Sequence, residues 1–337
     1  MRRQVWLGCV LVPLFFVACK SAAPAAPPGT WAIAIHGGAG VLSRNTPPEK
    51  VKEYEDALRV ALELGRDRLA RGDSALDVCE AVVRVLEDDP HFNAGKGAVF
   101  NEKGAHELDA SIMDGSTLRG GAVAGVRTVK NPISLARKVM EQTRHILLMG
   151  DGAEQFADAM GVERVPNTWF DTEHRRQVLE EVLKERAAKG ASALVAPRDR
   201  RHDYGTVGCV VRDTQGRLAA ATSTGGMTAK KWGRVGDTPL LGAGNYADGF
   251  CAVSGTGTGE QFIRHVVGRS ISARMEFGGQ TLAAAVQALV DDVLQPDDGG
   301  VIAVDRDGNL ALRWNSEGMY RGWADSRGAV GVRVFED

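Results

Sequence analysis

The most constraining feature of the sequence is a junction at Gly205-Thr206. Upstream, residues 171–205 begin as a charged helix and continue without a sustained hydrophobic period, which is typical of an exposed, mobile linker. Directly downstream, the apolar runs 206–212 and 218–224 have the length and β-branched content of strands. The chain therefore passes from linker to strand within a single peptide bond.

Helical and strand patterns alternate over the rest of the chain. A short apolar strand, Trp31–Ile35, ends in HGGAG, and a helix beginning at Ser74 carries Asp77 three positions later, as in a capping box. Because helices flank two blocks of strands, we expect a layered α/β fold. Further helices are predicted near 51–62, 258–268 and 279–295, and further strands near 106–113, 119–127, 299–305, 309–315 and 328–335.

The composition excludes several classes of protein. The 337 residues are 44% hydrophobic and 25% charged, which is ordinary for a globular protein and rules out a disordered or coiled-coil chain. Only 41 basic residues stand against 43 acidic ones, so the basic excess of a nucleic-acid binder is missing, and we expect no nucleic-acid partner.

The N-terminus has the pattern of an export signal over residues 1–18. Two arginines precede an apolar run, Val5 to Ala18, that is too short to span a bilayer comfortably. The run ends in FVAC at 16–19, which resembles a bacterial lipoprotein processing site, although Phe16 stands where Leu is usual. We expect either lipidation of Cys19 or ordinary cleavage near 22–26, followed by a flexible tether over 19–30. The protein is then exported, as a periplasmic or cell-envelope lipoprotein or in secreted form, and contacts a membrane only through a lipid.

The cysteines predict neither a disulfide framework nor a metal site. Cys79, Cys209 and Cys251 each lie within an apolar stretch and are interpreted as small buried hydrophobic residues. No CxxC or HExxH pattern occurs, so no catalytic metal is expected.

Three short segments after the junction carry chemically informative residues. They are HDYGTVG at 202–208, ATSTGG at 221–226 with GRVGD at 233–237, and SGTGTGE at 254–260. Each alone has an ordinary explanation: Thr206 as a strand residue, Arg234 and Asp237 as a surface ion pair, and the last segment as a phosphate-binding turn. That last segment matches neither the dinucleotide nor the Walker pattern, so a nucleotide site is weakly supported.

Taken together, the segments resemble one family. GTVG, AATSTGGMT, GRVGD and TGTGE, preceded by HGGAG and FNAGKGAVF, are similar to the isoaspartyl peptidase/plant-type L-asparaginase family of N-terminal nucleophile hydrolases, over residues 31–325. The resemblance implies a four-layer αββα sandwich and self-cleavage between Gly205 and Thr206. One domain would then consist of an α-chain, 31–205, whose last part (171–205) is the mobile linker, and a β-chain, 206–337.

The same resemblance implies roles for individual residues. Thr206 would be the nucleophile and would use its own α-amine as the base, since an α-amino group titrates near neutral pH. Thr224 would be a second catalytic threonine, and Thr256 with Gly257 an oxyanion hole. The implied substrate contacts are Arg234, Val235, Gly236, Asp237, Thr256, Gly257, Thr258 and Gly259; Asn93 would support the scissile bond, and backbone carbonyls of 86–96 would hold a structural Na⁺.

The implied reaction is hydrolysis of a side-chain amide in β-aspartyl dipeptides or L-asparagine, with no cofactor needed for catalysis, by an (αβ)₂ homodimer. Glycosylasparaginase is the nearest alternative, but its motifs typically read HDTIG, TSTNG and TGNGD, and only His202-Asp203 is shared with that branch. An inactive surface lipoprotein with the same fold is a second alternative, although every chemical position is intact.

Overall fold

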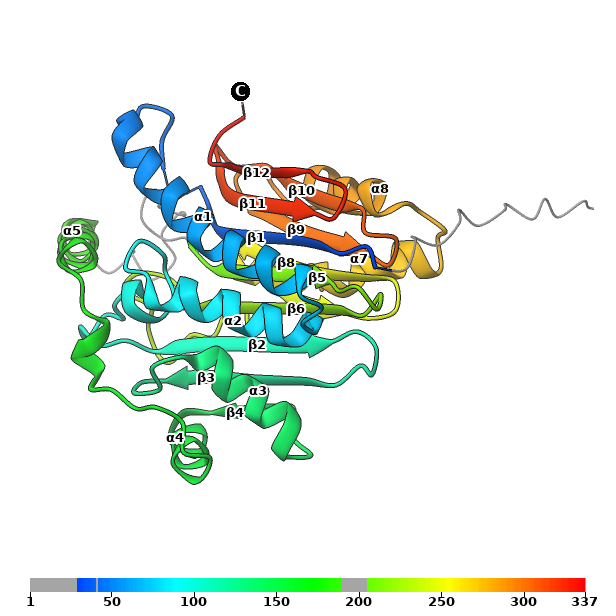
Figure 1. Cartoon of the computed structure of the whole chain (residues 1–337). Helices are drawn as coiled ribbons and strands as arrows, with labels where there is room; N and C mark the ends of the chain where they lie inside the picture. The colour runs from blue at the N-terminus through cyan, green and yellow to red at the C-terminus, as the bar shows by residue number, and fades with distance from the viewer. Residues whose placement is uncertain (1–28, 41, 190–204, 337) are drawn as a thin grey trace, which may run out of the picture.

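The computed structural model describes residues 29–40, 42–189 and 205–336 (Figure 1). The predicted signal, the lipidation site at Cys19, most of the tether and residues 190–204 of the linker lie outside the described residues. None of the helices in the described ranges combines the length and hydropathy needed to cross a membrane.

The described strands form two sheets. The larger has eight strands in the order β12-β11-β1-β5-β6-β2-β3-β4, antiparallel throughout except for the parallel β3–β4 pair. Its strands are β1 (Ala32–Ala39), β2 (Leu108–Asp114), β3 (Gly120–Val126), β4 (Leu147–Met149), β5 (Val207–Arg212), β6 (Leu218–Thr224), β11 (Met319–Asp325) and β12 (Val330–Arg333). The smaller, antiparallel sheet has the order β10-β9-β8-β7, with β7 (Asn245–Ala247), β8 (Cys251–Gly257), β9 (Gly299–Asp305) and β10 (Leu310–Trp314).

Helices cover the outer face of each sheet, as Figure 1 shows. The larger sheet carries α1 (Pro48–Ala70), α2 (Ala75–Asp88), α3 (Pro132–Gln142) and, near β4, α4 (Gly150–Ala159). The smaller sheet carries α7 (Val267–Glu276), α8 (Leu282–Gln287) and the π-helical η4 (Ala288–Val293), with α6 (Gly259–His265) following β8. The remaining helices in the described residues are α5 (Glu173–Lys189) and the short 3₁₀ turns η1 (Gly95–Gly97) and η2 (Asn167–Phe170).

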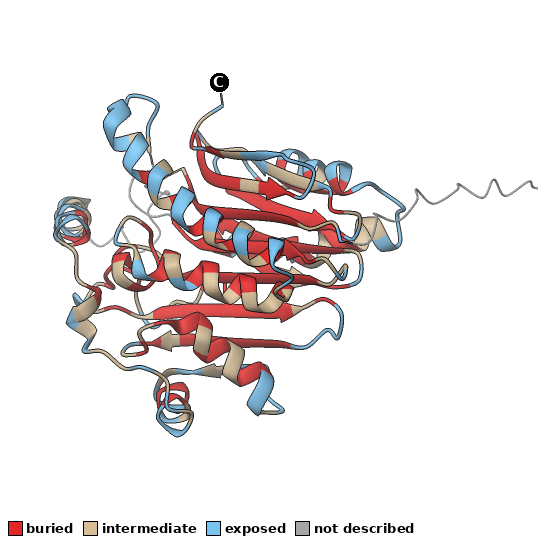
Figure 2. Ribbon diagram, in the orientation of Figure 1, coloured by how far each residue is buried: buried red, intermediate tan, exposed pale blue. Residues whose placement is uncertain are grey.

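The predicted four-layer αββα sandwich is confirmed. One core lies between α1–α3 and the larger sheet, a second between the smaller sheet and α7–α8, and a third between the two sheets. Figure 2 shows the strands as the most buried layers, while the outer faces of α1 and α5 are exposed. The inter-sheet core is rich in alanine, for example Ala32, Ala34 and Ala220, and small side chains let the two sheets approach closely.

Strand alternation assigns the site residues to one layer. In β1, Ile33 and Ile35 face the helices while Ala32 and Ala34 face the smaller sheet. Because side chains alternate between faces, His36 continues the inward row, and the same parity in β5 and β6 points Thr206 and Thr224 into the gap between the sheets. Thr256 of β8 continues the row of Ala252 from the opposite sheet. The junction residues therefore meet inside the sandwich.

The predicted elements differ from the observed ones in two places. The strand β11 was not predicted, because Arg321 and Gly322 interrupt its apolar pattern. The helix expected over 258–268 is two helices, separated at Val266, whose φ of +46° breaks the helical path. The charged helix expected at the start of the 171–205 linker is present as α5, and residues 190–204 lie outside the described residues.

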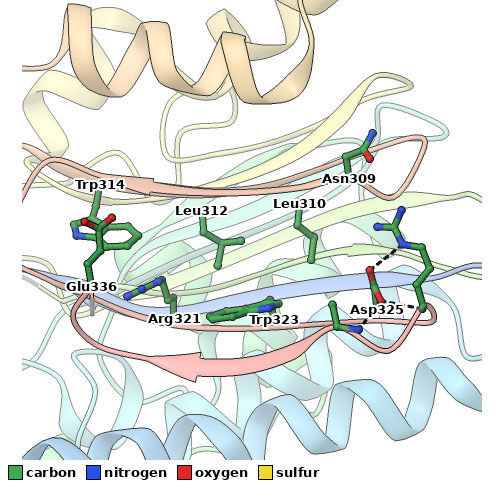
Figure 3. Close-up of a pocket in the computed structure, with 10 residues that line it drawn as sticks. Asn309, Leu310, Leu312, Trp314, Arg321, Trp323, Asp325 and Glu336 are labelled. Atoms are coloured by element: carbon green, nitrogen blue, oxygen red, sulfur yellow. Dashed lines mark hydrogen bonds and ion pairs between the residues drawn. The ribbon is translucent and has the colours of Figure 1, made fainter. Parts of the chain in front are cut away.

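A cavity of about 520 Å³ lies at one end of the sandwich, between β10 and β11 (Figure 3). Leu310, Leu312 and Trp314 line one side and Trp323 the other, with the Arg321 guanidinium 4.0 Å from the centre of a Trp314 ring. None of the predicted site residues lines this cavity.

Candidate active site

Thr206 lies directly before β5 and is 8% exposed. Its hydroxyl donates to Thr224 Oγ1 at 3.2 Å, and the Thr224 hydroxyl donates in turn to the carbonyl of Gly205 at 3.2 Å. Gly226 N–H also donates to Thr224 Oγ1 at 3.0 Å. Thr224 is thus oriented so that it accepts from the candidate nucleophile and polarises the carbonyl of the adjoining peptide bond.

Asn93 also donates a hydrogen bond to the Gly205 carbonyl. Its Nδ2 donates to Gly205 O at 2.8 Å and to Gly226 O at 2.7 Å, while its Oδ1 accepts from Val99 N–H at 2.9 Å. Two carbonyl acceptors and one N–H donor leave only this orientation of the amide. Gly205 has a φ of +155°, and a Cβ there would lie 2.9 Å from the Asn93 Cβ, so a larger residue would strain the backbone and displace Asn93.

His36 is a site residue that sequence reasoning missed. Its Nδ1 lies 2.8 Å from Thr206 O and its Nε2 lies 2.8 Å from Ser254 Oγ. Complete burial lowers the pKa of His36 to about 3, so the ring is neutral. A carbonyl only accepts, so Nδ1 carries the proton and donates to Thr206 O, and Nε2 accepts from the Ser254 hydroxyl. A Cβ at Gly208 would overlap both His36 and Ser254, which explains the glycine in GTVG.

Thr256 offers a free donor in the gap. It is 1% exposed, and its hydroxyl has no hydrogen-bond partner among the described residues. A buried hydroxyl without a partner is costly, and such groups concentrate at functional positions. The neighbouring N–H of Thr258 is occupied, since it donates to Asp298 O at 2.8 Å.

Arg234 and Asp237 lie together beside the turn that follows β8. Arg234 donates from Nε and Nη2 to the two oxygens of Glu260, each at 2.9 Å. Asp237 is 6% exposed and its Oδ2 has no partner among the described residues; burial raises its pKa to about 7, against the opposing charge of Arg234. A Cβ at Gly259 would lie 2.8 Å from both Arg234 Nη2 and Asp237 Oδ1, so this turn passes directly over the pair.

The predicted substrate contacts Val235 and Gly236 lie between these two residues. Gly236 is buried and Val235 is half-buried. A cationic fork and an acceptor-only carboxyl, held side by side, can bind the carboxylate and the ammonium of one amino acid. A threonine hydroxyl, a polarised carbonyl and an adjacent cation and carboxyl are the groups that an amide hydrolase with a threonine nucleophile would need.

Comparison with known proteins agrees with this geometry. Residues 29–333 match the model of the asparaginase family. The chain belongs to the asparaginase family. It is 50% identical over 302 residues to the isoaspartyl peptidase of Escherichia coli K12, covering 88% of this chain and 93% of the relative. It is 52% identical over 298 residues to the isoaspartyl peptidase of Salmonella typhimurium LT2, covering 86% and 94%. It is also 44% identical over 291 residues to the mouse isoaspartyl peptidase/L-asparaginase, covering 85% and 86%.

Two further charged groups of this asparaginase-family chain lie beside the site. Lys230 is 4% exposed, its Nζ donates to Glu107 O at 2.7 Å, and a Cβ at Gly226 would lie 2.9 Å from that ammonium. Asp109 is fully buried and pairs with Thr224 in the β2–β6 register. Burial lowers the pKa of Lys230 and raises that of Asp109, and each charge opposes the shift of the other. Sequence reasoning missed both, because neither belongs to a recognisable motif alone.

The loop after α2 connects the core of the molecule to the site. Glu87 is fully buried, and its Oε1 accepts from Ser223 Oγ at 2.6 Å and from Ile133 N–H at 3.0 Å; burial raises its pKa to about 8. Ser223 precedes Thr224, so the carboxyl joins α2, α3 and β6. The carbonyls of Glu87, Pro90 and Phe92 turn toward η1, and α2 ends without a backbone cap.

Carbonyl oxygens are the ligand type that hard cations prefer. No group of three or more His, Cys, Asp or Glu that could hold a metal occurs in the described ranges. The prediction for the cysteines is confirmed, since Cys79, Cys209 and Cys251 are buried and free.

Proposed function

We propose that the chain is a self-activating amidohydrolase that cleaves β-aspartyl dipeptides and L-asparagine through Thr206. The observation that carries the proposal is the hydrogen-bond chain from the Thr206 hydroxyl through Thr224 to the Gly205 carbonyl. The names of the relatives, isoaspartyl peptidase and isoaspartyl peptidase/L-asparaginase, support the substrate class.

Self-cleavage begins with attack of Thr206 Oγ1 on the Gly205 carbonyl. The carbonyl oxygen accepts from Asn93 Nδ2 and Thr224 Oγ1, and these donors stabilise the charge that develops on it. The C–N bond breaks as the nitrogen takes up a proton, which leaves an ester between Gly205 and Thr206 Oγ1. Water hydrolyses this ester and yields a carboxylate at Gly205, with a free hydroxyl and a free α-amine at Thr206.

The free α-amine then acts as the general base in turnover. An amine of this kind titrates near neutral pH and lies on the nucleophile itself, whereas an amide nitrogen cannot take a proton. His36 cannot replace it, because Nδ1 already holds its proton for Thr206 O and Nε2 is occupied by Ser254. Thr206 Oγ1 attacks the β-carbonyl, the amine leaves with a proton, and water releases aspartate from the resulting ester.

Substrate orientation follows from the charges of Arg234 and Asp237. The α-carboxylate of the aspartyl moiety fits the Arg234 fork, and the α-ammonium fits the unpaired Asp237 carboxyl, with Gly259 adding a backbone donor. Thr256 Oγ1 and the Gly257 N–H supply the oxyanion hole; one such donor contributes about 2.7–4 kcal/mol to the barrier. Val235, Gly236 and Thr258 shape the wall around the clamp.

We extend the proposal to ion binding and assembly. The carbonyls within 86–96 would hold a Na⁺ that fixes the loop carrying Asn93, and no step of the chemistry passes through the ion. The mature enzyme would be an (αβ)₂ dimer. Both proposals draw on the family resemblance, and the carbonyl arrangement around η1 supports the first.

We further propose that the enzyme works outside the cytoplasm. The pattern of residues 1–18 and the FVAC sequence at 16–19 support export and lipidation of Cys19, with secretion after ordinary cleavage as the alternative. The mass of the N-terminal peptide of the purified protein decides between them, since a diacylglycerol at Cys19 adds a defined mass that simple cleavage does not.

Hydrolysis assays with different substrates and denaturing electrophoresis test the proposed function together. Wild-type protein should hydrolyse β-aspartyl-leucine and L-asparagine and should separate into two bands under denaturing conditions. Thr206→Ala should remain one chain and be inactive, while Thr206→Ser is expected to retain part of both activities. Hydrolysis of N-acetylglucosaminyl-asparagine alone would instead establish a glycosylasparaginase, and an uncleaved, inactive wild type would contradict the proposal and favour an inactive surface protein.

A further inference from the structure

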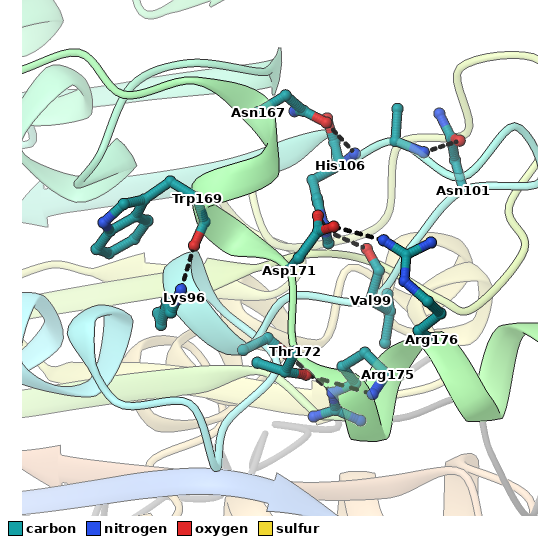
Figure 4. Close-up of polar contacts among 12 residues, drawn as sticks. Lys96, Val99, Asn101, His106, Asn167, Trp169, Asp171, Thr172, Arg175 and Arg176 are labelled. Atoms are coloured by element: carbon teal, nitrogen blue, oxygen red, sulfur yellow. Dashed lines mark hydrogen bonds and ion pairs between the residues drawn. The ribbon is translucent and has the colours of Figure 1, made fainter.

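Arg175, in the first turn of α5, is a nearly buried cation without an acidic partner. It is 6% exposed, and its guanidinium makes one hydrogen bond to a described residue, from Nε to Gly97 O at 2.8 Å (Figure 4). Buried arginines normally have their donors satisfied, because an uncompensated charge is expensive to remove from water. The neighbouring Arg176 differs, since it pairs with Asp171.

The other nearly buried arginines among the described residues each donate hydrogen bonds to several backbone carbonyls. Arg212 is 5% exposed and donates to carbonyls of Thr30, Arg306 and Asp213. Arg321 is 8% exposed and donates to carbonyls of Met319, Val334 and Phe335. Arg175 is as buried as Arg212 and Arg321, but its guanidinium has a single acceptor. Most of its N–H donors therefore have no hydrogen-bond partner among the described residues.

Two tyrosines beside Arg175 add hydroxyl donors but no negative charge. Tyr54 and Tyr320 are 4% and 2% exposed, and their rings stack with centroids 4.7 Å apart. Apart from a side-chain contact with the Tyr54 hydroxyl, the Tyr320 hydroxyl has no hydrogen-bond partner among the described residues. Burial raises the pKa of both tyrosines, so both hydroxyls keep their protons, and the charge of Arg175 acts on both.

We propose that Arg175, Tyr54 and Tyr320 form a receptor for a carboxylate. The cluster presents a guanidinium and a buried phenol hydroxyl without enough acceptors, and a carboxylate is an acceptor-only anion that matches a guanidinium fork. Its charge would also offset the cost of keeping Arg175 buried.

The loop that carries Asn93 links this receptor to the scissile bond. Phe92 contacts both tyrosine rings, with centroids 6.2 Å from Tyr54 and 6.4 Å from Tyr320. The next residue, Asn93, binds the Gly205 carbonyl at 2.8 Å, and Gly97 of the same loop accepts from Arg175. The proposed reaction supplies two sources of carboxylate: the Gly205 terminus that self-cleavage creates, and a free carboxylate of substrate or product. Both sources rest on the proposed function, whereas the receptor itself does not.

Acetate serves as the probe, and the uncleaved Thr206→Ala protein is the first host because its Gly205 is still in a peptide bond. At constant ionic strength, with acetate replacing chloride, we expect the melting temperature to rise and saturate. Adding Arg175→Met should weaken the apparent acetate affinity by at least about tenfold, and adding Tyr320→Phe should weaken it less. Arg137→Met is the matched control, because Arg137 pairs with Asp77, Glu80 and Glu141, and its loss should leave the acetate response unchanged.

Mature wild-type protein distinguishes the two sources. If it no longer responds to acetate, the Gly205 carboxylate occupies the receptor; if it responds as Thr206→Ala does, the receptor takes free carboxylates. An uncleaved host with no saturable response, or one whose response survives both Arg175→Met and Tyr320→Phe, overturns the proposal. The acetate experiment on Thr206→Ala needs no self-cleavage, so its result does not depend on the proposed function. A wild-type protein that remains a single band would overturn the proposed function and leave the acetate result standing.

Discussion

Arg234 binds Glu260 through the same two nitrogens that the substrate carboxylate would need. The pair is partly open to water, with Arg234 side-chain exposure of 20% and Glu260 of 55%, so its contribution is about 1 kcal/mol or less. Substrate can therefore displace Glu260 at small cost. The pair explains how a cation stays oriented between turnovers.

Displacement of Glu260 from Arg234 by the substrate carboxylate predicts a specific kinetic effect of Glu260→Gln. Removing the competing charge should lower the KM for L-asparagine by up to about fivefold, with a smaller change in kcat. Steady-state kinetics of the cleaved variant measure both constants, and Arg313→Gln, which breaks the distant pair with Asp291, is the control. A raised KM would mean that Glu260 positions Arg234 and does not compete with substrate.

At the scale of elements, one side chain links three strands. His36 at the middle of β1 reaches the residue before β5 through Nδ1 and reaches β8 of the opposite sheet through Nε2. Ser254 continues the chain to Thr222 of β6 at 2.8 Å. These bonds hold Thr206 in register with both sheets, and they require a neutral imidazole.

The neutral state of His36 predicts how stability varies with pH. Its pKa falls from about 6.5 to about 3 on folding, so the unfolded chain binds the extra proton below pH 6.5. The stabilisation is complete above pH 6.5 and is lost as the pH falls toward 3. Between pH 7 and pH 5 the loss should be about 2 kcal/mol.

Urea unfolding of the single-chain Thr206→Ala protein measures the contribution of His36 to the free energy of unfolding. As the pH is lowered from 7 to 5, the free energy of unfolding should decrease more steeply in Thr206→Ala than in Thr206→Ala/His36→Asn, because the asparagine amide does not titrate. Equal slopes in the two proteins would mean that His36 is charged in the fold, and the assignment of its proton to Nδ1 alone would then be wrong.

At the scale of the whole molecule, the two halves of the chain interleave within one sheet. Strands β1, β2, β3 and β4 precede the junction, while β5, β6, β11 and β12 follow it. The order β12-β11-β1-β5-β6-β2-β3-β4 places β1 between two later strands and β6 against an earlier one. Cleavage at Gly205-Thr206 therefore cuts no sheet hydrogen bond and leaves the shared core intact.

This topology predicts that the cleaved chains stay together. In native gel filtration they should co-elute as one species, and they should separate only in denaturant, because parting them would expose both faces of β1 and β5. Refolding from separated chains should be much less efficient than refolding of Thr206→Ala. Native dissociation into two folded chains would contradict the shared sheet.

The sequence by itself pointed to the residues that are proposed to carry the chemistry. Thr206, Thr224, Arg234, Asp237 and Asn93 could be named because each lies in a short motif whose residue types suit one reaction. Local patterns also predicted most helices and strands, including the Ser74 cap, where Ser74 Oγ accepts from Asp77 N–H at 3.2 Å. Periodicity and capping depend on neighbours along the chain, so they are readable without a structure.

Only the tertiary structure decided which distant groups complete those motifs. His36 meets Ser254 across two sheets, Glu260 occupies Arg234, and Arg175 is buried without an acid, and no spacing along the chain encodes these contacts. The strand β11 escaped prediction for the same reason, since its burial between β1 and β12 overrides a charged and glycine-containing sequence. Burial and long-range pairing set charge states and partners, and both are properties of the packed sandwich, not of any local segment.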